Sequence, residues 1–331
     1  MTPSTPATLQ LRVDEARELN PLIRLLRLSA PDGAALPGFT PGAHVRVQVT
    51  LPGGQADWRH YSLVNASTAA AASAAPRHYL IAVRRDDQGR GGSRYMHQQV
   101  QVGQVMTVEV PRNEFELDHP AGCAVLVAGG IGVTPLVGMA AQRIADGAAV
   151  RMHYAGRSRS QMAFLPELQG LLHAALHVHA DDEAGAPLDV EALLDACSAT
   201  DELFVCGPKP LLDAVLARTH ARGWARERVH FEVFAPATVA AGDHAFEVLL
   251  AQDGRTVQVK ADQSILDALI DAGCDPLFDC KRGECGVCAV PVIEGDIDHR
   301  DYVLSESERQ AGKVIQICIS RCKGRRLVLD L

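Results

Sequence analysis

The sequence lacks an excess of positive charge. Its 331 residues include 32 lysines and arginines against 40 aspartates and glutamates, which gives a formal net charge of −8 at pH 7. Because a nucleic-acid partner normally requires a basic face, we expect no nucleic-acid binding. The sequence also has no apolar stretch approaching the roughly 18 residues that a membrane span requires. Residues Met1 to Ala7 show no basic start followed by an apolar run. We therefore expect neither a membrane segment nor a secretory signal.

The cysteines do not form the even, closely spaced set of a small disulfide-rich domain. There are 9 in total, and six of them lie between Cys274 and Cys322. An odd count in a long chain without a signal is typical of cytosolic thiols or metal ligands. The sequence therefore predicts a cytoplasmic protein, and nothing in it demands more than a monomer.

The spacing of apolar residues changes along the chain, which predicts three domains. Residues 1–118 alternate in the period of a strand, as at Val45, Val47 and Val49, between frequent turns, and predict an antiparallel β-barrel. Residues 119–234 alternate short apolar runs with helical segments, the rhythm of a doubly wound parallel α/β domain. Residues 235–243 predict a linker, and 244–331 predict a third domain. The Ala- and Ser-rich stretch 66–76 predicts a surface loop.

Four cysteines of the third domain have a characteristic spacing. Three lie in the run Cys280-Lys-Arg-Gly-Glu-Cys285-Gly-Val-Cys288, and Cys318 follows later. This is the C-x4-C-x2-C…C pattern of plant-type [2Fe-2S] sites, in which two thiolates bind each iron. The glycines inside the loop let it turn and bring backbone N–H groups toward the sulfurs. Such hydrogen bonds raise the potential by stabilising the reduced cluster.

Other interpretations of these cysteines remain open from the residues alone. Structural zinc sites usually use two C-x2-C pairs, whereas this region contains one such pair. Unligated thiols are a further alternative. Cys322 competes with Cys318 for the fourth position.

A glycine-rich turn links a strand to a helix in the second domain. In Gly129-Gly130-Ile131-Gly132-Val133-Thr134-Pro135, the glycines allow a pyrophosphate to approach the backbone at the start of a helix. Thr134 is predicted at the N-cap and Pro135 at the first helical position. The third glycine of the dinucleotide fingerprint is missing, so a merely tight turn is the alternative.

Three further strand ends in this domain are predicted to face the same ligand. Cys206-Gly207-Pro208 also follows a strand and precedes a helix, and loops at the carboxyl edge of one sheet converge on the ligand. The alternative for Cys206 is a buried thiol. Arg157 and Ser158 end the second strand, at the edge where a ribose or phosphate would lie. The alternative for them is an exposed basic turn. Asp181 follows the third strand.

The barrel carries two short polar motifs. Arg59, Tyr61, Ser62 and Leu63 belong to the motif Arg-His-Tyr-Ser-Leu. Arginine pairs with phosphate, tyrosine covers an aromatic ring, and serine donates a hydrogen bond to a ring nitrogen. A strand with one exposed arginine is the alternative. The second motif is a phosphate-compatible turn that opens a helix and contains Gly91, Gly92 and Ser93.

These motifs, in this order, resemble the phthalate dioxygenase reductase family, which includes the reductases of vanillate O-demethylases and other Rieske oxygenases. The resemblance covers nearly the whole chain, apart from the Ala-rich insertion at 69–75. It implies a multidomain α+β protein with an antiparallel flavin-binding β-barrel, a doubly wound parallel α/β nucleotide-binding domain, and a C-terminal plant-type ferredoxin (β-grasp) domain.

The resemblance also implies the cofactors and their residues. It places FMN on the barrel, with Arg59 and Ser93 near the phosphate and Tyr61 and Ser62 near the ring. It places NADH on the second domain at Gly130, Gly132, Thr134, Arg157, Ser158, Asp181, Cys206, Gly207 and Pro208. Ser62, Thr134 and Cys206 are the expected catalytic residues. It favours Cys318 over Cys322 as the fourth cluster ligand. Asp181 and Asp182 disfavour a 2′-phosphate, whereas Arg157 and Arg159 favour one, so NADPH remains an alternative.

The function that follows is an NADH-dependent oxidoreductase. It passes electrons from NADH through FMN and [2Fe-2S] to a separate Rieske-type terminal oxygenase that acts on an aromatic or similar small compound. The docking face is expected around the cluster loop, where Lys281, Arg282 and Glu284 either steer the partner or form a solvated surface. One alternative is a stand-alone reductase of small-molecule acceptors. Another is a non-enzymatic iron–sulfur or zinc protein.

Overall fold

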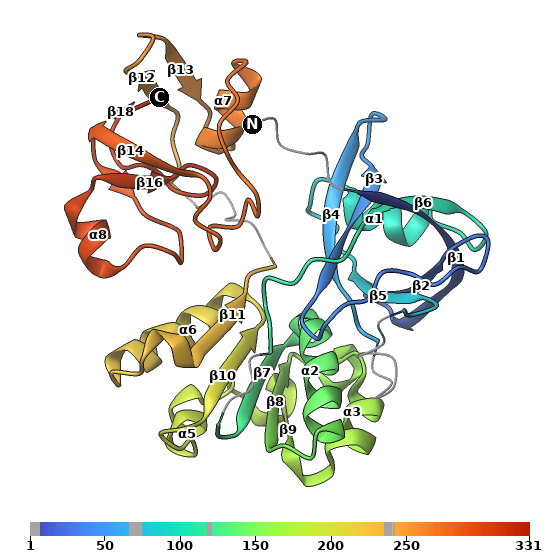
Figure 1. The fold of residues 1–331 in the computed structure, drawn as a ribbon. Helices are drawn as coiled ribbons and strands as arrows, with labels where there is room; N and C mark the ends of the chain where they lie inside the picture. Colours follow the sequence, from blue (N-terminus) through green and yellow to red (C-terminus); the bar gives the residue numbers. More distant parts are fainter. Residues whose placement is uncertain (1–6, 66–74, 118–120, 235–239, 241) are drawn as a thin grey trace. The chain divides into compact units, whose positions relative to one another are not determined.

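The structure is a computed structural model that describes residues 7–65, 75–117, 121–234, 240 and 242–331. The chain divides into two compact units, an N-terminal unit (Met1–Glu232) and a C-terminal unit (Val233–Leu331) (Figure 1). The predicted loop at 66–76 and the predicted linker at 235–243 lie largely outside the described residues.

The first part of the N-terminal unit is a closed antiparallel sheet. Its order is β4-β3-β6-β1-β2-β5, and a bridge between Leu63 and Ile81 joins the two edges. Val45, Val47 and Val49 are all buried, as their alternation predicts. The predicted barrel is therefore confirmed. Its elements are β1 (Thr8–Asn20), β2 (Ile23–Ser29), β3 (His44–Thr50), β4 (Ala56–Ser62), β5 (Tyr79–Arg84), α1 (Gly92–Gln98) and β6 (Val105–Glu109).

The second part of this unit is a parallel sheet of five strands in the order β11-β10-β7-β8-β9. Consecutive strands run outward from β7 through β8 to β9, and the chain then returns to β10 on the other side of β7. The order thus reverses between β7 and β10, where open α/β sheets bind their ligands. The strands are β7 (Ala124–Gly129), β8 (Val150–Gly156), β9 (Leu176–Ala180), β10 (Glu202–Cys206) and β11 (Val229–Glu232).

Helices and single turns connect these strands. Because the crossovers are right-handed and run in opposite directions from β7, helices cover both faces of the sheet (Figure 1). The α-helices are α2 (Val133–Ala145), α3 (Leu165–Leu172), α4 (Asp181–Ala184), α5 (Val190–Asp195) and α6 (Lys209–Ala221). The 3-10 turns are η1 (Gly130–Gly132), η2 (Arg159–Gln161), η3 (His173–Ala175) and η4 (Arg226–Arg228).

The C-terminal unit is a mixed sheet in the order β13-β12-β18-β14-β16, in which β12 and β18 are parallel neighbours. Ser264 caps α7 by accepting a hydrogen bond from the backbone N–H of Asp267 at 3.0 Å. The elements are β12 (Phe246–Leu250), β13 (Thr256–Val259), α7 (Ile265–Asp271), β14 (Ala289–Glu294), β15 (Ile297–Asp298), α8 (Glu306–Ala311), β16 (Val314–Gln316), β17 (Arg321–Cys322) and β18 (Arg326–Leu329). The run of Cys280, Cys285 and Cys288 lies in the irregular segment between α7 and β14.

Within the described residues, no helix is long and apolar enough to cross a membrane. In the same part of the chain, none of the nine cysteines is joined to another by a disulfide.

Candidate functional site

Two predicted nucleotide loops meet at the point where the strand order reverses. The loop after β7 and the loop after β10 lie in direct backbone contact. A Cβ atom on Gly132 would lie 2.2 Å from the carbonyl oxygen of Cys206 and 2.7 Å from the nitrogen of Gly207. A Cβ atom on Gly129 would lie 2.5 Å from Pro208 Cδ. Glycine is required at both positions by this close approach, which brings the two loops to a single edge of the sheet.

The start of α2 differs from the prediction. Gly132, which ends the turn η1, is the N-cap residue, and Thr134 lies inside the first turn of the helix. The Thr134 hydroxyl donates to the carbonyl oxygen of Ile131 at 3.0 Å. The predicted N-cap role of Thr134 is therefore wrong, because the 3-10 turn Gly130–Gly132 precedes the helix and places the N-cap at Gly132, two residues before Thr134. Thr134 still lies at the nucleotide edge, but its donor proton is used within the turn.

The predicted residues at the ends of β8 and β9 are neighbours. The backbone N–H of Asp182, in the first turn of α4, donates to the carbonyl oxygen of Arg157 at 3.1 Å. Ser158 and Ser160 share a hydrogen bond of 3.0 Å between their hydroxyl groups. Arg157, Ser158 and the start of α4 thus lie side by side along the edge that continues from the two glycine loops.

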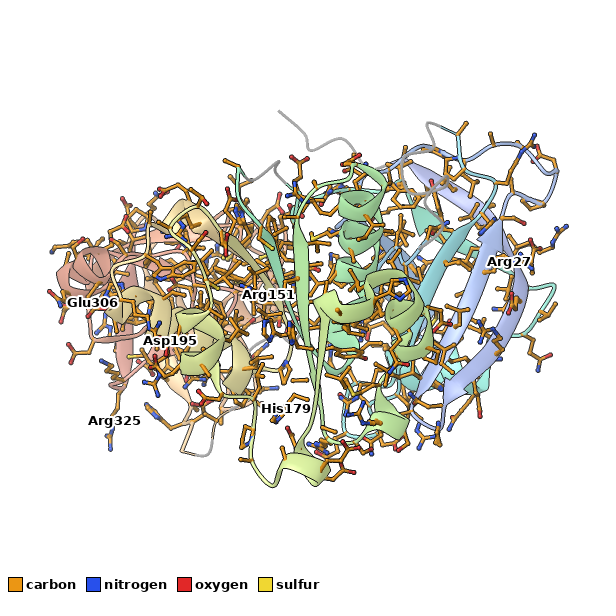
Figure 2. All side chains as sticks on the ribbon, turned by 90° about the horizontal axis from the view of Figure 1, so that it is seen from below. Arg27, Arg151, His179, Asp195, Glu306 and Arg325 are labelled. Atoms are coloured by element: carbon orange, nitrogen blue, oxygen red, sulfur yellow. The ribbon has the colours of Figure 1, made fainter. Side chains whose placement is uncertain are left out.

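The charges at this edge are not equivalent. Arg159 Nε lies 2.8 Å from a carboxylate oxygen of Glu183, so its charge is already paired. Arg157 is exposed, and none of the described residues forms an ion pair with it. Asp181 lies 3.4 Å from Nε2 of His179. His179 lies near the end of β9 (Figure 2). Among the described residues of this edge, Arg157 is thus a cation without an ion-pair partner, and Asp181 and Glu183 are acids.

In the barrel, Arg59 lies against the predicted phosphate turn. A Cβ atom on Gly92 would lie 2.6 Å from Arg59 Nε, so the guanidinium passes directly over the first residue of α1. Asp57 holds Arg59 Nη1 at 2.6 Å and also lies 3.2 Å from Arg90 Nη2. Sequence reasoning missed Asp57 and Arg90, although Arg90 stands inside the glycine-rich motif. The two arginines around this turn suit a phosphate group.

Ser62 is the most informative residue of the predicted flavin motif. Its side chain is 5% exposed, and its Oγ is buried without a hydrogen-bond partner among the described residues. A buried hydroxyl without a partner is costly, so it marks a place where a ligand supplies one. Leu63 is also buried. Burial raises the pKa of the neighbouring Tyr61 above its ordinary value, which keeps the phenol neutral. These residues fit the ring of a flavin.

The Ser93 side chain is engaged elsewhere. Its Oγ accepts from the backbone N–H of Asp86 at 3.0 Å and donates to the carbonyl oxygen of Asp86 at 3.2 Å. Gly91 is the N-cap of α1, with a φ of 104° that favours glycine. The Ser93 hydroxyl thus closes the loop before the helix, which leaves backbone N–H groups and the arginines as donors to a phosphate.

The four predicted cluster ligands form two pairs of thiols. Cys285 donates to Cys280, and together with backbone N–H groups of the loop this lowers the pKa of Cys280 to about 5. Cys318 donates to Cys288, which lowers the pKa of Cys288. A binuclear cluster requires two thiolates on each iron, so two pairs fit it. Among the described residues, no three His, Cys, Asp or Glu side chains are grouped to hold a single metal ion.

Cys322 lies apart from these pairs. It is buried in the core of the C-terminal unit, and its Sγ contacts the carbonyl oxygen of Arg326 at 3.4 Å. The geometry therefore groups Cys318, and not Cys322, with the three cysteines of the loop.

Two charged residues of the cluster loop are not on the surface. The side chains of Arg282 and Glu284 are only 6% and 12% exposed, and they form an ion pair of 2.6 Å. Both predicted roles, steering the partner and forming a solvated surface, require exposed side chains. Both roles are therefore wrong for Arg282 and Glu284, which are largely buried. Lys281 alone is exposed, and its Nζ lies 3.2 Å from Asp267 and 4.6 Å from the ring centre of Phe278.

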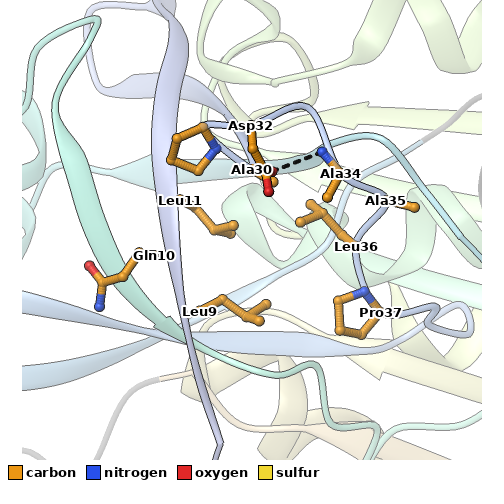
Figure 3. Close-up of a pocket in the computed structure, with 10 residues that line it drawn as sticks. Leu9, Gln10, Leu11, Ala30, Asp32, Ala34, Ala35, Leu36 and Pro37 are labelled. Atoms are coloured by element: carbon orange, nitrogen blue, oxygen red, sulfur yellow. Dashed lines mark hydrogen bonds between the residues drawn. The ribbon is translucent and has the colours of Figure 1, made fainter.

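A separate cavity of about 400 Å³ opens beside the barrel. It lies between residues 9–11 of β1 and residues 30–37 of the loop that follows β2, where Asp32 accepts from the backbone N–H of Ala34 at 3.0 Å (Figure 3). All of its lining residues are outside the predicted sites.

Comparisons with known proteins agree with the geometry. A family model described as an oxidoreductase NAD-binding domain matches residues 126–216. A second model, described as a 2Fe-2S iron-sulfur cluster binding domain, matches residues 248–323. The first match contains the ends of β7 and β10, between which the strand order reverses. The second match contains all four paired thiols.

Full-length relatives extend the match to the barrel. A toluene-4-sulfonate monooxygenase system reductase subunit of Comamonas testosteroni is 40% identical over 307 residues, 92% of this chain and 93% of the relative. The heme-dependent oxidative N-demethylase beta subunit of Ectopseudomonas mendocina is 38% identical over 323 residues, 98% of this chain and 99% of the relative. The solved structure of phthalate dioxygenase reductase, described as a modular structure for electron transfer from pyridine nucleotides to [2Fe-2S], matches with a TM-score of 0.74 at 35% identity over 98% of both chains. The chain thus belongs to the phthalate dioxygenase reductase family of oxygenase reductase components, and its cofactors are NADH, FMN and a [2Fe-2S] cluster.

Proposed function

We propose that this reductase delivers its electrons to a separate Rieske-type terminal oxygenase that acts on an aromatic or similar small compound. The observation that carries this proposal is the full-length match to phthalate dioxygenase reductase, which extends through the barrel, the parallel sheet and the thiol pairs. NADH supplies a hydride, and FMN and the cluster convert it into single electrons. The nine thiols without a disulfide support a reducing, cytoplasmic location, and we propose a monomer.

The residues at each site have separable roles in this proposal. The loops of Gly130 to Gly132 and Cys206 to Pro208 bind the nicotinamide nucleotide, and Thr134 and Cys206 stand next to its reacting end. Arg59 and the backbone N–H groups of Gly91, Gly92 and Ser93 hold the flavin phosphate, while Tyr61, Ser62 and Leu63 hold the ring. Cys280, Cys285, Cys288 and Cys318 bind the two irons. Asp181 accepts from the adenosine ribose, and the pairing of Arg159 with Glu183 supports NADH over NADPH.

Replacing Ser62 with alanine tests whether its buried hydroxyl, which has no hydrogen-bond partner among the described residues, binds the flavin ring. Because Ser62 Oγ has no partner within the described protein, its removal leaves no other group unpaired, so the free energy of unfolding should change by less than about 1 kcal/mol. The loss of a donor to the flavin ring should slow flavin reduction by NADH by about tenfold or more. Stopped-flow absorbance of the flavin measures this rate. A Ser62→Ala variant that is strongly destabilised but reduces its flavin at the normal rate would contradict the assigned role.

The proposed docking face is the apolar surface around the cluster loop, formed by Leu277, Phe278 and Val287. These side chains are 77%, 41% and 46% exposed. Val287 lies between the ligands Cys285 and Cys288 in the sequence. Exposed apolar side chains next to a redox centre favour a protein partner, because docking removes them from water. Lys281 adds one cation to this face.

Placing a charge on this face should weaken docking selectively. Val287→Asp is expected to raise the KM for the oxygenase by about tenfold, because a carboxylate must be desolvated in the interface. NADH-to-ferricyanide turnover through the flavin should stay unchanged. Ile293→Asp is the matched control, since Ile293 is 56% exposed on β14 of the same unit but outside the cluster loop. Equal effects of the two variants would count against this face.

A second candidate partner is a haem-containing oxygenase. It is favoured by the full-length similarity to the heme-dependent N-demethylase subunit. Anaerobic stopped-flow mixing of the NADH-reduced protein with a Rieske oxygenase, a haem oxygenase and a small acceptor such as a ferric chelate separates these partners. The proposal predicts fast, saturable reduction of the Rieske protein. Faster saturable reduction of the haem protein, or of the chelate at low concentration, would overturn it.

A further inference from the structure

Glu284 makes contacts on two sides of the cluster loop. Its carboxylate oxygen Oε2 accepts a hydrogen bond from the backbone N–H of Val233 at 2.8 Å. Its own backbone N–H donates toward the sulfur of Cys280. One residue thus joins a cluster ligand to the first residue of the C-terminal unit. Its side chain is 12% exposed, so water competes little for either bond.

Arg282 fixes the orientation of this carboxylate. Its Nη2 lies 2.6 Å from the other oxygen of Glu284, and its side chain is 6% exposed. The backbone N–H of Arg282 also donates to Cys280 Sγ at 3.3 Å. This buried ion pair favours one geometry of the carboxylate.

Val233 has a special position in the chain. It directly follows Glu232, the last residue of β11 and of the N-terminal unit. The segment that begins at Val233 is also fastened at its other end. Asp243 Oδ2 accepts from Arg300 Nη1 at 3.0 Å and from the backbone N–H of Ala240 at 2.9 Å. Both ends of this segment are therefore bound to the C-terminal unit.

We propose that Glu284 is a positioning residue for electron transfer from FMN to the cluster. By holding Val233, it ties the cluster loop to the residue that directly follows β11 in the chain. Rates of electron transfer fall steeply as the distance between centres grows, so a loosened loop transfers electrons more slowly. The inference rests on the reductase function but is independent of which oxygenase accepts the electrons.

Two substitutions remove the contact from opposite sides. Glu284→Ala removes the acceptor, and Val233→Pro removes the donor N–H while leaving the cluster loop unchanged. Both should speed hydrogen–deuterium exchange at the contact: at Val233 in the first variant, and in the cluster loop in the second. In both, the rate of cluster reduction after flavin reduction should fall by about tenfold, the scale of losing a charge-assisted hydrogen bond. In Val233→Pro, which keeps the ion pair of Arg282 and Glu284, the midpoint potential of the cluster should stay unchanged. In both variants the rate of flavin reduction by NADH should stay unchanged.

Controls separate positioning from other roles. Glu284→Gln keeps an acceptor oxygen and should recover part of the rate, while Glu294→Ala removes an exposed carboxylate of the same unit and should change nothing. A shifted potential with unchanged amide exchange would assign Glu284 an electronic role and overturn the proposal. Faster exchange with an unchanged transfer rate would also overturn it. If Glu284→Ala does not assemble its cluster, the outcome depends on Val233→Pro. These readouts need no oxygenase, so they are independent of the proposed partner.

Discussion

Replacing Cys285 with serine is expected to abolish reduction of the acceptor protein and to spare NADH-to-ferricyanide turnover through the flavin. Serine offers a hard hydroxyl oxygen with a high pKa in place of a soft thiolate, so the iron that Cys285 shares with Cys280 loses half of its protein ligands. The rate of acceptor reduction should fall by about 1,000-fold or more, because the cluster no longer forms or no longer cycles. Steady-state assays with the two acceptors measure both activities in one preparation.

The other buried cysteines of the C-terminal unit provide the controls. Cys318→Ser should behave like Cys285→Ser, because the Cys318 thiol pairs with Cys288. Cys322→Ser should keep its cluster, because the Cys322 thiol contacts the carbonyl oxygen of Arg326. Iron content and the visible spectrum report the outcome. Loss of iron in the Cys322 variant with retention in the Cys318 variant would reverse the ligand assignment.

Replacing Gly132 with alanine should have the second large effect. The added Cβ would lie 2.2 Å from the Cys206 carbonyl oxygen and 2.7 Å from the Gly207 nitrogen, and both atoms belong to the backbone. No side-chain rotation relieves such a clash, so the two nucleotide loops must separate. NADH-dependent turnover with ferricyanide should fall by about 100-fold, since a misplacement of about 1 Å at the reacting groups has effects of this size.

Gly170→Ala is the matched control for this prediction. Gly170 lies in α3 of the same domain, and a Cβ atom there would meet nothing within 4 Å. It should leave turnover unchanged and raise stability slightly, because alanine favours a helix more than glycine does. The Gly132 variant should retain its FMN, which the flavin absorbance reports. Normal turnover of Gly132→Ala would show that the loops tolerate separation.

The sequence was sufficient to predict those features that depend on the spacing of residues along the chain. The distances along the chain between Cys280, Cys285 and Cys288 predict a two-iron site, because three thiolates must come from one short loop. The alternation at Val45 and Val47 predicts the buried face of the barrel. The two glycine loops, which follow different strands, were expected at one sheet edge because of the parallel topology.

The parts that could not be predicted depend on packing between distant residues. Burial of Arg282 and Glu284 arises because Glu284 meets Val233, some 50 residues earlier in the chain, a contact that leaves no local pattern. The N-cap of α2 is Gly132 and not the predicted Thr134, because a 3-10 turn precedes the helix. Glycine and threonine both occur at N-caps, so the residue types alone do not distinguish the two positions. The orphaned hydroxyl of Ser62 is likewise visible only once its surroundings are known.

The central claim is that this chain carries electrons from NADH through FMN to a [2Fe-2S] cluster formed by the two thiol pairs. Anaerobic addition of NADH to the purified protein, followed by visible absorbance and electron paramagnetic resonance, tests it most directly. The account predicts that the flavin and cluster absorbance bleach together and that a reduced-cluster signal appears and then decays when an oxidised oxygenase is added. A colourless protein with stoichiometric zinc, or a cluster that stays oxidised in excess NADH, would contradict it.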